Sequence, residues 1–375
     1  LLVETLLTRL RMAVSLATGA AVVIIVLSLA GGQLLPLAGI PAGSWKVILL
    51  GYVFLASVLP VWVLLQPRDF MNSFLLFALM LAGLAGAAWA NPSLEHLPWT
   101  GFTSDLGPLF PILFVTVACG AVSGFHSLVS SGTTAKQLDR ESQARPVAMG
   151  AMLVESLLAV IALITAAMLA PEVYTERLAG DGAISLFAAG IGRFTGALGL
   201  DPAHGAAFAS VAVAAFALTS LDTATRIGRL ALQELAAPAA EKEASRLPLR
   251  RLVHRNRYAA TTITVLAGGA LALSGSAGTI WPLFGAANQM LAALGFLAVL
   301  CWLTRAGRRR LFILLPTLFM FLVTIAALGW KVWEFLAAGK PRWGLAGMAL
   351  VLALLSLHLA GEAVTAVRNQ APARD

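Results

Sequence analysis

The sequence predicts an all-α integral membrane protein, transporter-like, with about ten transmembrane helices, some of them broken or re-entrant. Three observations support this class. Of the 375 residues, 59% are hydrophobic and only 12% are charged, whereas soluble chains carry about 25% charged residues. Apolar runs of roughly 17 to 25 residues, each long enough to cross a bilayer, recur along the chain. Basic residues gather in alternate loops, as the positive-inside rule requires. We therefore expect a single polytopic membrane domain over residues 1–375.

The apolar runs define the spans in order. They cover residues 12–30, 47–65, 70–90, 108–126, 147–170, 206–224, 259–275, 284–303, 311–329 and 343–366. When both termini are placed in the cytoplasm, most of the 26 Lys and Arg residues fall on inside segments. The net charge of +8 thus follows from membrane topology, and we expect no nucleic-acid partner.

Two connections are long. Residues 171–205 are predicted to be an external loop whose small and apolar residues favour an interfacial helix or a partial re-entrant cover. Residues 225–258 are predicted to be a basic cytoplasmic loop that lies near anionic lipid headgroups.

A polar interruption follows the fourth span, in "SGFHSLVSSGTTAKQLDRES" at residues 123–142. Gly, Ser and Thr are poor helix formers and offer hydroxyl partners to an unwound backbone. Within a membrane, irregular backbone is tolerated only inside the protein or against a water-filled cavity, and secondary transporters build their sites from such breaks. The alternative is a frayed helix end at the interface. The candidate substrate-binding residues here are His126, Ser130, Ser131, Thr133 and Thr134.

Two further breaks are expected. In residues 216–235, Asp222 lies at the cytoplasmic end of a span with Arg226 four residues on, which predicts an i,i+4 ion pair that is either structural or an inner gate. In residues 274–291, Pro282 interrupts the helix. There Asn288 and Gln289 open the next apolar helix, where they either orient substrate or form caps and helix–helix hydrogen bonds.

Glu155 lies in the middle of the fifth predicted span, where a carboxylate is costly and is by default a functional candidate. Its helical neighbours include Ala151 and Ala159, whereas Leu153 and Leu157 lie on the other side. Because small residues mark close packing in membranes, we expect Glu155 to point into the protein and to bind and release the coupling proton. Asp222 is the second coupling candidate, and a structural Glu155 is the alternative.

No motif of a hydrolase, a metalloprotease, a disulfide oxidoreductase or a P-loop protein is present in the sequence. We predict no enzymatic activity, no metal and no cofactor. A membrane enzyme that uses His126 and Glu155 has too few ligands for a closed metal site. A nutrient-sensing membrane module without transport is the other alternative.

Five stretches together resemble the carbon starvation protein A family. They are "GYVFLASVLPVWVLLQPRD", "ACGAVSGFHSLVSSGTTAKQL", "GAMLVESLLA", "LTSLDTATRIGR" and "WPLFGAANQMLAA", in family order between about residues 47 and 292. The resemblance implies a bacterial inner-membrane transporter that takes up peptides or pyruvate. It also implies coupling to H⁺ or Na⁺ and internal inverted repeats. Family members usually carry a further N-terminal membrane region with a His-His and Gly-rich motif, which residues 1–46 do not match. We therefore expect a fragment or short form.

The sequence thus predicts a secondary transporter for a small organic acid such as pyruvate or for short peptides, driven by protons. Glu155 and Asp222 are the coupling candidates, and Asp222 with Arg226 forms the gate. Substrate would bind the broken-helix residues and, facing them, Asn288 and Gln289. The oligomeric state is not predicted.

Overall fold

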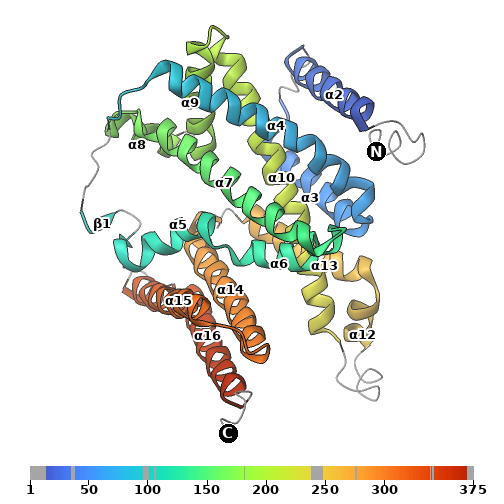
Figure 1. Cartoon of the computed structure of the whole chain (residues 1–375), viewed down its shortest axis with the longest axis vertical. Helices are drawn as coiled ribbons and strands as arrows, with labels where there is room; N and C mark the ends of the chain where they lie inside the picture. Colours follow the sequence, from blue (N-terminus) through green and yellow to red (C-terminus); the bar gives the residue numbers. More distant parts are fainter. Residues whose placement is uncertain are drawn as a thin grey trace. The chain divides into compact units, whose positions relative to one another are not determined.

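The structure is a computed structural model that describes residues 14–34, 39–95, 101–104, 107–180, 182–237, 248–274, 277–337, 339 and 342–369. These residues are almost entirely helical (Figure 1). The chain forms two compact units, and each unit is built from two separate stretches. Unit 1 comprises Leu1–Pro98 and Met152–Leu273, and unit 2 comprises Trp99–Ala151 and Ser274–Asp375.

Unit 1 consists of helices from both of its sequence stretches, which residues 99–151 separate. In its first stretch lie α2 (Val14–Leu34), α3 (Ala42–Val58) and α4 (Val61–Ala90). In its second lie the larger part of α7 (Ala144–Ala167), then α8 (Pro171–Gly180), α9 (Gly182–Ala197), α10 (Pro202–Leu235), α12 (Pro248–Arg255) and α13 (Arg257–Leu273). Pro60 separates α3 from α4, because the residue before a proline avoids helical geometry.

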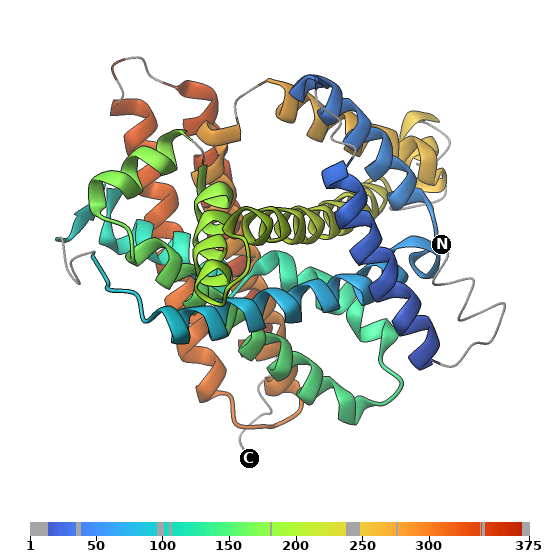
Figure 2. The same cartoon turned by 90° about the horizontal axis from the view of Figure 1, so that it is seen from above.

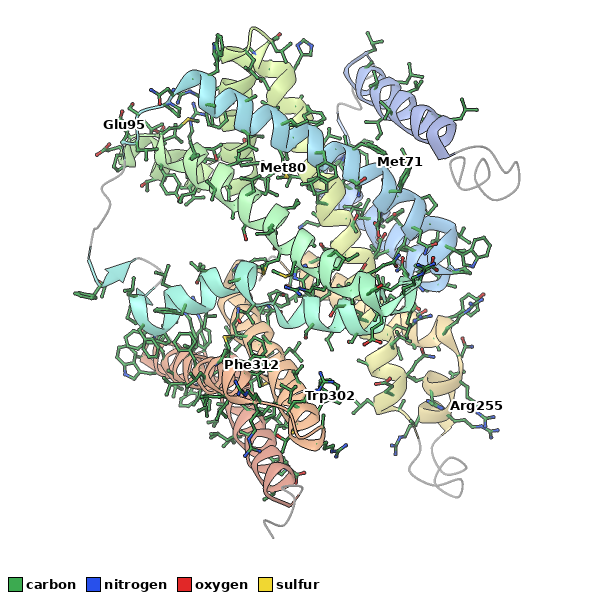
Figure 3. All side chains as sticks on the ribbon, in the orientation of Figure 1. Met71, Met80, Glu95, Arg255, Trp302 and Phe312 are labelled. Carbon is green, nitrogen blue, oxygen red and sulfur yellow. The ribbon has the colours of Figure 1, made fainter. Side chains whose placement is uncertain are left out.

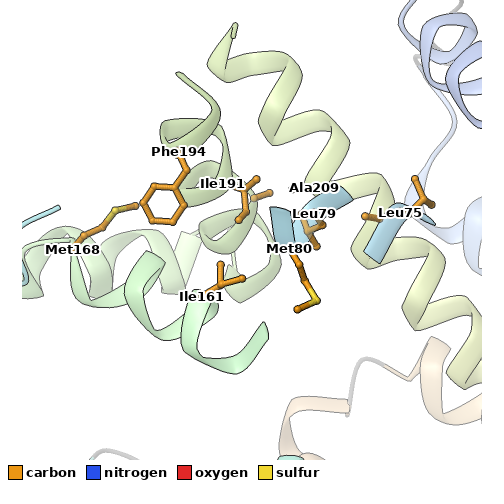
Figure 4. Close-up of a cluster of buried hydrophobic side chains, with 10 residues drawn as sticks. Leu75, Leu79, Met80, Ile161, Met168, Ile191, Phe194 and Ala209 are labelled. Carbon is orange, nitrogen blue, oxygen red and sulfur yellow. The ribbon is translucent and has the colours of Figure 1, made fainter. Parts of the chain in front are cut away.

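The core of unit 1 lies between α4, α7, α9 and α10. Its buried members include Leu79, Ile161, Ile191 and Phe194, which converge in Figure 4. Gly86 permits this packing, because a Cβ there would collide with the side chain and backbone of Phe194.

Residues 171–205 contain α8, α9 and the start of α10, and α9 is a core element of unit 1. The external position of this region stays a prediction. Gly190 and Gly192 permit close packing, since a Cβ at these positions would collide with Thr165 and with the Pro202 carbonyl.

Unit 2 starts with a short antiparallel pair, β1 (Thr103–Ser104) and β2 (Gly107–Pro108), and the π-helical turn η2 (Leu109–Leu113). It continues through α5 (Phe114–Ala121), α6 (Gly124–Gly132) and the short 3₁₀ turns η3 (Thr134–Gln137) and η4 (Glu141–Gln143). Its second stretch holds α14 (Ala277–Arg305), α15 (Leu311–Ala337) and α16 (Trp343–Asn369), which lie together in Figures 1 and 2. Val115, Leu283, Val323 and Leu328 belong to the buried core of this unit.

Six helical segments are long and apolar enough to cross a membrane. They are Val61–Ala90, Glu141–Ala167, Pro202–Leu235, Leu283–Arg305, Leu311–Ala337 and Trp343–Glu362. Large apolar side chains such as Trp302 and Phe312, both labelled in Figure 3, are exposed on them. Exposed apolar belts of this kind suit contact with lipid, so the chain is a multi-pass membrane protein. The structure confirms the all-α class, whereas the expected count of about ten spans is not confirmed.

Two of the three predicted breaks are absent. Pro282 lies inside α14, which runs without interruption from Ala277 to Arg305. Pro282 is the sixth residue of this helix, so it removes the backbone hydrogen bond to the carbonyl of residue 278 without ending the helix. Likewise Asp222 lies within the continuous helix α10, so its threonine-rich surroundings do not end the helix.

Candidate functional site

A cluster of charged side chains lies inside unit 1, between α3, α4 and α10. On α10, Asp222 is completely buried and Arg226 and Arg229 are each 8% exposed. The three positions are separated by four and three residues, so they share one face of the helix. Arg68 on α4 and Tyr52 on α3 complete the cluster. Charged residues this deep in an apolar helix require partners, and they mark functional candidates in a membrane protein.

Asp222 is held from two neighbouring helices. The Tyr52 hydroxyl donates a hydrogen bond to Asp222 Oδ2 over 3.1 Å. Arg68 Nη1 donates to the Tyr52 hydroxyl over 2.6 Å and forms an ion pair with the same Asp222 oxygen. Asp222 Oδ1 is buried and accepts no hydrogen bond. One carboxylate oxygen therefore ties α3, α4 and α10 together, while the other is left without a donor.

The polar strip continues for one turn of α4. Asn72 Nδ2 donates to Thr219 Oγ1 over 2.9 Å and to the Ala215 carbonyl over 3.4 Å. Both acceptors lie on the face of α10 that carries Asp222, since Ala215 and Thr219 precede Asp222 by seven and three residues. The contact between α4 and α10 is thus polar along its length as well as ionic.

The predicted ion pair between Asp222 and Arg226 is wrong. Asp222 pairs with Arg68, and Arg226 Nη2 instead donates to the carbonyl oxygens of Ala56 and Leu59 over 2.6 Å each. These carbonyls end α3, where the last turn of a helix has acceptors without intrahelical donors. A guanidinium at a helix C-terminus also meets the negative end of its dipole. Arg226 is therefore a cap of α3.

Arg229 has no comparable partner. Its Nε is fully enclosed and makes no hydrogen bond, and none is formed by its other guanidinium nitrogens to any residue that the structure describes. Arg226 and Arg257, two other cations, are within electrostatic reach of it. The cluster therefore contains more buried positive charge than negative charge.

Unit 2 contains the first predicted break, and this prediction is confirmed. α5 ends at Ala121 and α6 begins at Gly124, with Ser123 as the N-cap that accepts a hydrogen bond from the His126 N–H over 3.4 Å. Asn288 Oδ1, on α14, accepts from the Phe125 N–H over 2.7 Å. A helix start inside the protein needs such acceptors for its free N–H groups.

Asn288 and Gln289 are both buried, and both form hydrogen bonds with the segment that contains the break between α5 and α6. Asn288 Nδ2 donates to Ser123 Oγ over 3.4 Å, and Gln289 Nε2 donates to the Val115 carbonyl on α5 over 3.5 Å. α6 can approach α14 this closely because residue 124 is glycine. A Cβ there would collide with the backbone of Asn288 and Ala292.

The other substrate-binding candidates of the break do not converge on these amides. Ser130 and Ser131 are exposed, and their hydroxyls donate to the Ser127 carbonyl one turn earlier, over 2.9 Å each. His126 is also exposed. Thr133, half-buried, ends α6, and Thr134 starts η3. The hydroxyls of Ser130 and Ser131 thus satisfy the local backbone, as Ser and Thr in membrane helices often do.

Glu155 is exposed on α7, contrary to the expectation that it points into the protein. The buried side of α7 is the one that carries Ile161 and Thr165, with Val154 and Leu158 packed partly against the same core. Ala151 and Ala159 are exposed together with Glu155. The alanine stripe therefore does not mark the packed face within this chain, because large aliphatic residues supply the α7 contacts.

Tyr52 and Arg68 are not among the residues that the sequence predicts, because the predicted spans at 47–65 and 70–90 put Arg68 in the loop between them. Pro60 was the available signal. A helix that restarts after Pro60 contains Arg68 in its second turn, and such a buried arginine requires a carboxylate elsewhere in the membrane region. In the described part of the chain, no group of three or more His, Cys, Asp or Glu side chains has a metal-binding arrangement.

Comparison with known proteins identifies the family. The family model for carbon starvation protein CstA matches residues 1–179 and 175–327. The chain belongs to the CstA family. It is 34% identical to "Peptide transporter CstA" of Escherichia coli K12 over 76% of this chain and 49% of that protein. It is 32% identical to the Bacillus subtilis "Peptide transporter CstA", over 75% of this chain and 53% of the relative.

A third relative carries a different transport name. The chain is 30% identical to "Pyruvate/proton symporter BtsT" of Escherichia coli K12, over 76% of this chain and 50% of that protein. The chain thus spans about half the length of these CstA-family relatives. No solved structure matches the chain.

Proposed function

We propose that this CstA-family chain forms part of a secondary transporter in the bacterial inner membrane, with both termini cytoplasmic. The transporter takes up a small organic acid such as pyruvate, or short peptides, together with protons. The names of the relatives support this class of activity, since two are peptide transporters and one is a pyruvate/proton symporter. All of these relatives are named as transporters rather than as enzymes.

The observation that carries the proposal is the buried Asp222 network of unit 1. A carboxylate buried in a membrane helix is the usual element of a proton relay. Asp222 has one oxygen bound by Arg68 and Tyr52 and one oxygen without a donor. A proton that binds to Oδ1 neutralises the carboxylate and so weakens its attraction to Arg68.

This weakening gives protonation a mechanical consequence. The Asp222 carboxylate is the shared acceptor for groups on α3 and α4. When it is neutral, Arg68 loses its buried counter-charge and keeps only the partly exposed Asp69, whose Oδ1 is 3.6 Å from Arg68 Nη2. The polar contacts between α4 and α10 then rest mainly on Asn72 and Thr219. Two such arrangements, charged and neutral, are what a proton needs in order to bias a conformational equilibrium.

In this proposal, Asp222 is preferred to Glu155 as the coupling carboxylate, because contacts within the described residues support only Asp222. The substrate-binding role of His126, Ser130, Ser131, Thr133 and Thr134 stays a proposal for the surface of unit 2. The contacts of Asn288 and Gln289 favour a different role for these two residues. They hold the broken helix in place and so support that surface indirectly.

The test is uptake of labelled pyruvate and of labelled dialanine into membrane vesicles that contain the protein at full length. Imposed proton and sodium gradients are compared. We expect accumulation under a proton gradient, lost in Asp222→Asn but with exchange of internal for external substrate retained. Accumulation of neither substrate under any gradient would refute transport of these solutes. Equal accumulation by Asp222→Asn would refute the role of Asp222.

A further inference from the structure

Arg229 is a buried cation of unit 1 that has no counter-charge among the described residues. It is 8% exposed, yet it makes no ion pair and no hydrogen bond with any residue that the structure describes. A buried charge without a partner is strongly unfavourable, so such a group is normally paired with an anion. Because only Nε is both enclosed and unpaired, the other guanidinium nitrogens keep the small accessibility that a bound anion requires.

The surroundings of Arg229 leave it in need of negative charge. Asp222, the buried carboxylate on the same face of α10, is already bound by Arg68. Arg226, one turn before Arg229, is satisfied by the carbonyls that end α3. Each buried cation of the cluster therefore has an acceptor except Arg229. A single carboxylate would complete the set.

A second donor without a partner lies on the neighbouring helix. Ser57 is completely buried, and its hydroxyl makes no hydrogen bond. It belongs to the last turn of α3, between Ala56 and Leu59, the two residues whose carbonyls bind Arg226. Buried hydroxyls are rarely left without a partner. Two such donors, on helices that Arg226 joins, both fit an anion with oxygen acceptors.

We propose that Arg229 is the anchor of a carboxylate-binding subsite in unit 1, with Ser57 as a second donor and Arg226 as a supporting charge. The ligand is the carboxylate of the transported solute, so this inference rests on the proposed function. A guanidinium presents parallel N–H donors that match the two oxygens of a carboxylate. A phosphate group has the same kind of acceptors, and anionic lipid is the other source that the test must separate.

The subsite would place substrate and proton on one helix. Asp222 and Arg229 are seven residues apart on α10, which corresponds to about 10 Å along the helix axis. An anion bound at Arg229 removes part of the positive potential that acts on Asp222 and thereby favours proton binding there. Substrate and proton would then bind cooperatively, which a symporter requires.

The experiment measures thermal unfolding of the full-length protein in neutral detergent, with added pyruvate, dialanine, pyruvamide or phosphatidylglycerol. Pyruvamide has the shape of pyruvate but no carboxylate. The variants are Arg229→Gln, Arg229→Lys and the control Arg255→Gln, which removes an exposed arginine of α12 that is labelled in Figure 3. We expect pyruvate or dialanine, but not pyruvamide, to raise the unfolding temperature of the parent and of Arg255→Gln.

For Arg229→Gln we expect the half-saturating carboxylate concentration to rise at least tenfold, with Arg229→Lys in between. Without ligand, Arg229→Gln should unfold at the same temperature as the parent or higher, because an unpaired buried charge has been removed. If its unliganded unfolding temperature is clearly lower, Arg229 already has a partner in the protein and the subsite is refuted. Arg229→Lys, which keeps the charge, tests the ligand response even if the Gln variant does not fold.

Two other outcomes would overturn the inference. One is an unchanged carboxylate response in Arg229→Gln. The other is stabilisation through Arg229 by phosphatidylglycerol alone, which would make the ligand a lipid phosphate. The vesicle assay separates this inference from the proposed function. Pyruvate uptake without an Arg229-dependent response refutes only the subsite, whereas carboxylate binding at Arg229 without uptake refutes only transport.

Discussion

Arg68 and Asp222 form a buried ion pair that joins α4 to α10 across 154 positions of sequence. The Arg68 side chain is 15% exposed and that of Asp222 is fully buried. Removing Arg68 leaves Asp222 buried without a counter-charge, and removing Asp222 leaves Arg68 with only the partly exposed Asp69. Removing both leaves apolar side chains of similar size. The pair is therefore expected to behave non-additively.

The first prediction is a double-mutant cycle on this pair. Arg68→Met and Asp222→Leu should each lower the free energy of unfolding by about 3 kcal/mol. The double variant should be clearly more stable than the sum of the two effects implies. Thermal unfolding in detergent is measured for the parent, the two single variants and the double variant. If the two effects add, the ion pair does not stabilise unit 1.

The second prediction concerns the Arg226 cap of α3. Arg226→Gln removes charged hydrogen bonds to two carbonyls, and we expect a loss of about 2 kcal/mol in stability. Arg255→Gln, at an exposed position of α12, should change stability by less than about 0.5 kcal/mol. The measurement is again thermal unfolding. If Arg226→Gln lowers stability while Asp222 is present but not in a protein that also carries Asp222→Leu, the ion pair between Asp222 and Arg226 that the sequence predicted would be supported instead.

The third prediction tests whether Asn288 is a helix cap. Asn288→Leu removes the acceptor of the Phe125 N–H and should cost about 1–2 kcal/mol. Asn288→Asp keeps the acceptor at the start of α6, where negative charge is favourable, so it should restore most of the stability. Pyruvate and dialanine uptake should follow protein stability in both variants. Weakened uptake in a stable Asn288→Asp protein would show direct substrate contact.

The all-α membrane class was predictable from composition, because long apolar runs with few charges have no other stable arrangement in a bilayer. The break before α6 was predictable as well, since Ser123 and Gly124 disfavour a continuous helix and supply a cap. Asp222 was also recognised from sequence, as a carboxylate among apolar residues.

The partner of Asp222 was not predictable in the same way. An i,i+4 arginine is always available along a helix, and only the packing of α3 and α4 against α10 shows that Arg226 binds carbonyls and Arg68 binds the carboxylate. The predicted orientation of α7 was wrong for a related reason. Alanine lines both close helix contacts and bare helix surfaces, so the stripe through Glu155 does not say which face is covered.

The fourth prediction is topological. With cytoplasmic termini, Ser93 lies outside and Arg308 inside, and both are exposed in the structure. In a background without other reactive cysteines, cysteine at position 93 should react with an impermeant maleimide added to intact cells. Cysteine at position 308 should react only after the membrane is permeabilised. The opposite pattern of labelling would invert the proposed orientation.

The last prediction compares the two coupling candidates directly. Glu155→Gln and Asp222→Asn make the same chemical change, since each keeps a hydrogen-bonding side chain of the same size but cannot carry a negative charge. Glu155 is exposed on α7, whereas Asp222 is the shared acceptor of Tyr52 and Arg68. Only at Asp222 does loss of charge alter contacts between helices. We therefore expect Glu155→Gln to accumulate pyruvate or dialanine under a proton gradient with the pH dependence of the parent. Asp222→Asn should exchange substrate but not accumulate it. The measurement is initial uptake against external pH at matched protein abundance. If Glu155→Gln loses accumulation while Asp222→Asn keeps it, the proton is carried on α7 and the Asp222 network is structural.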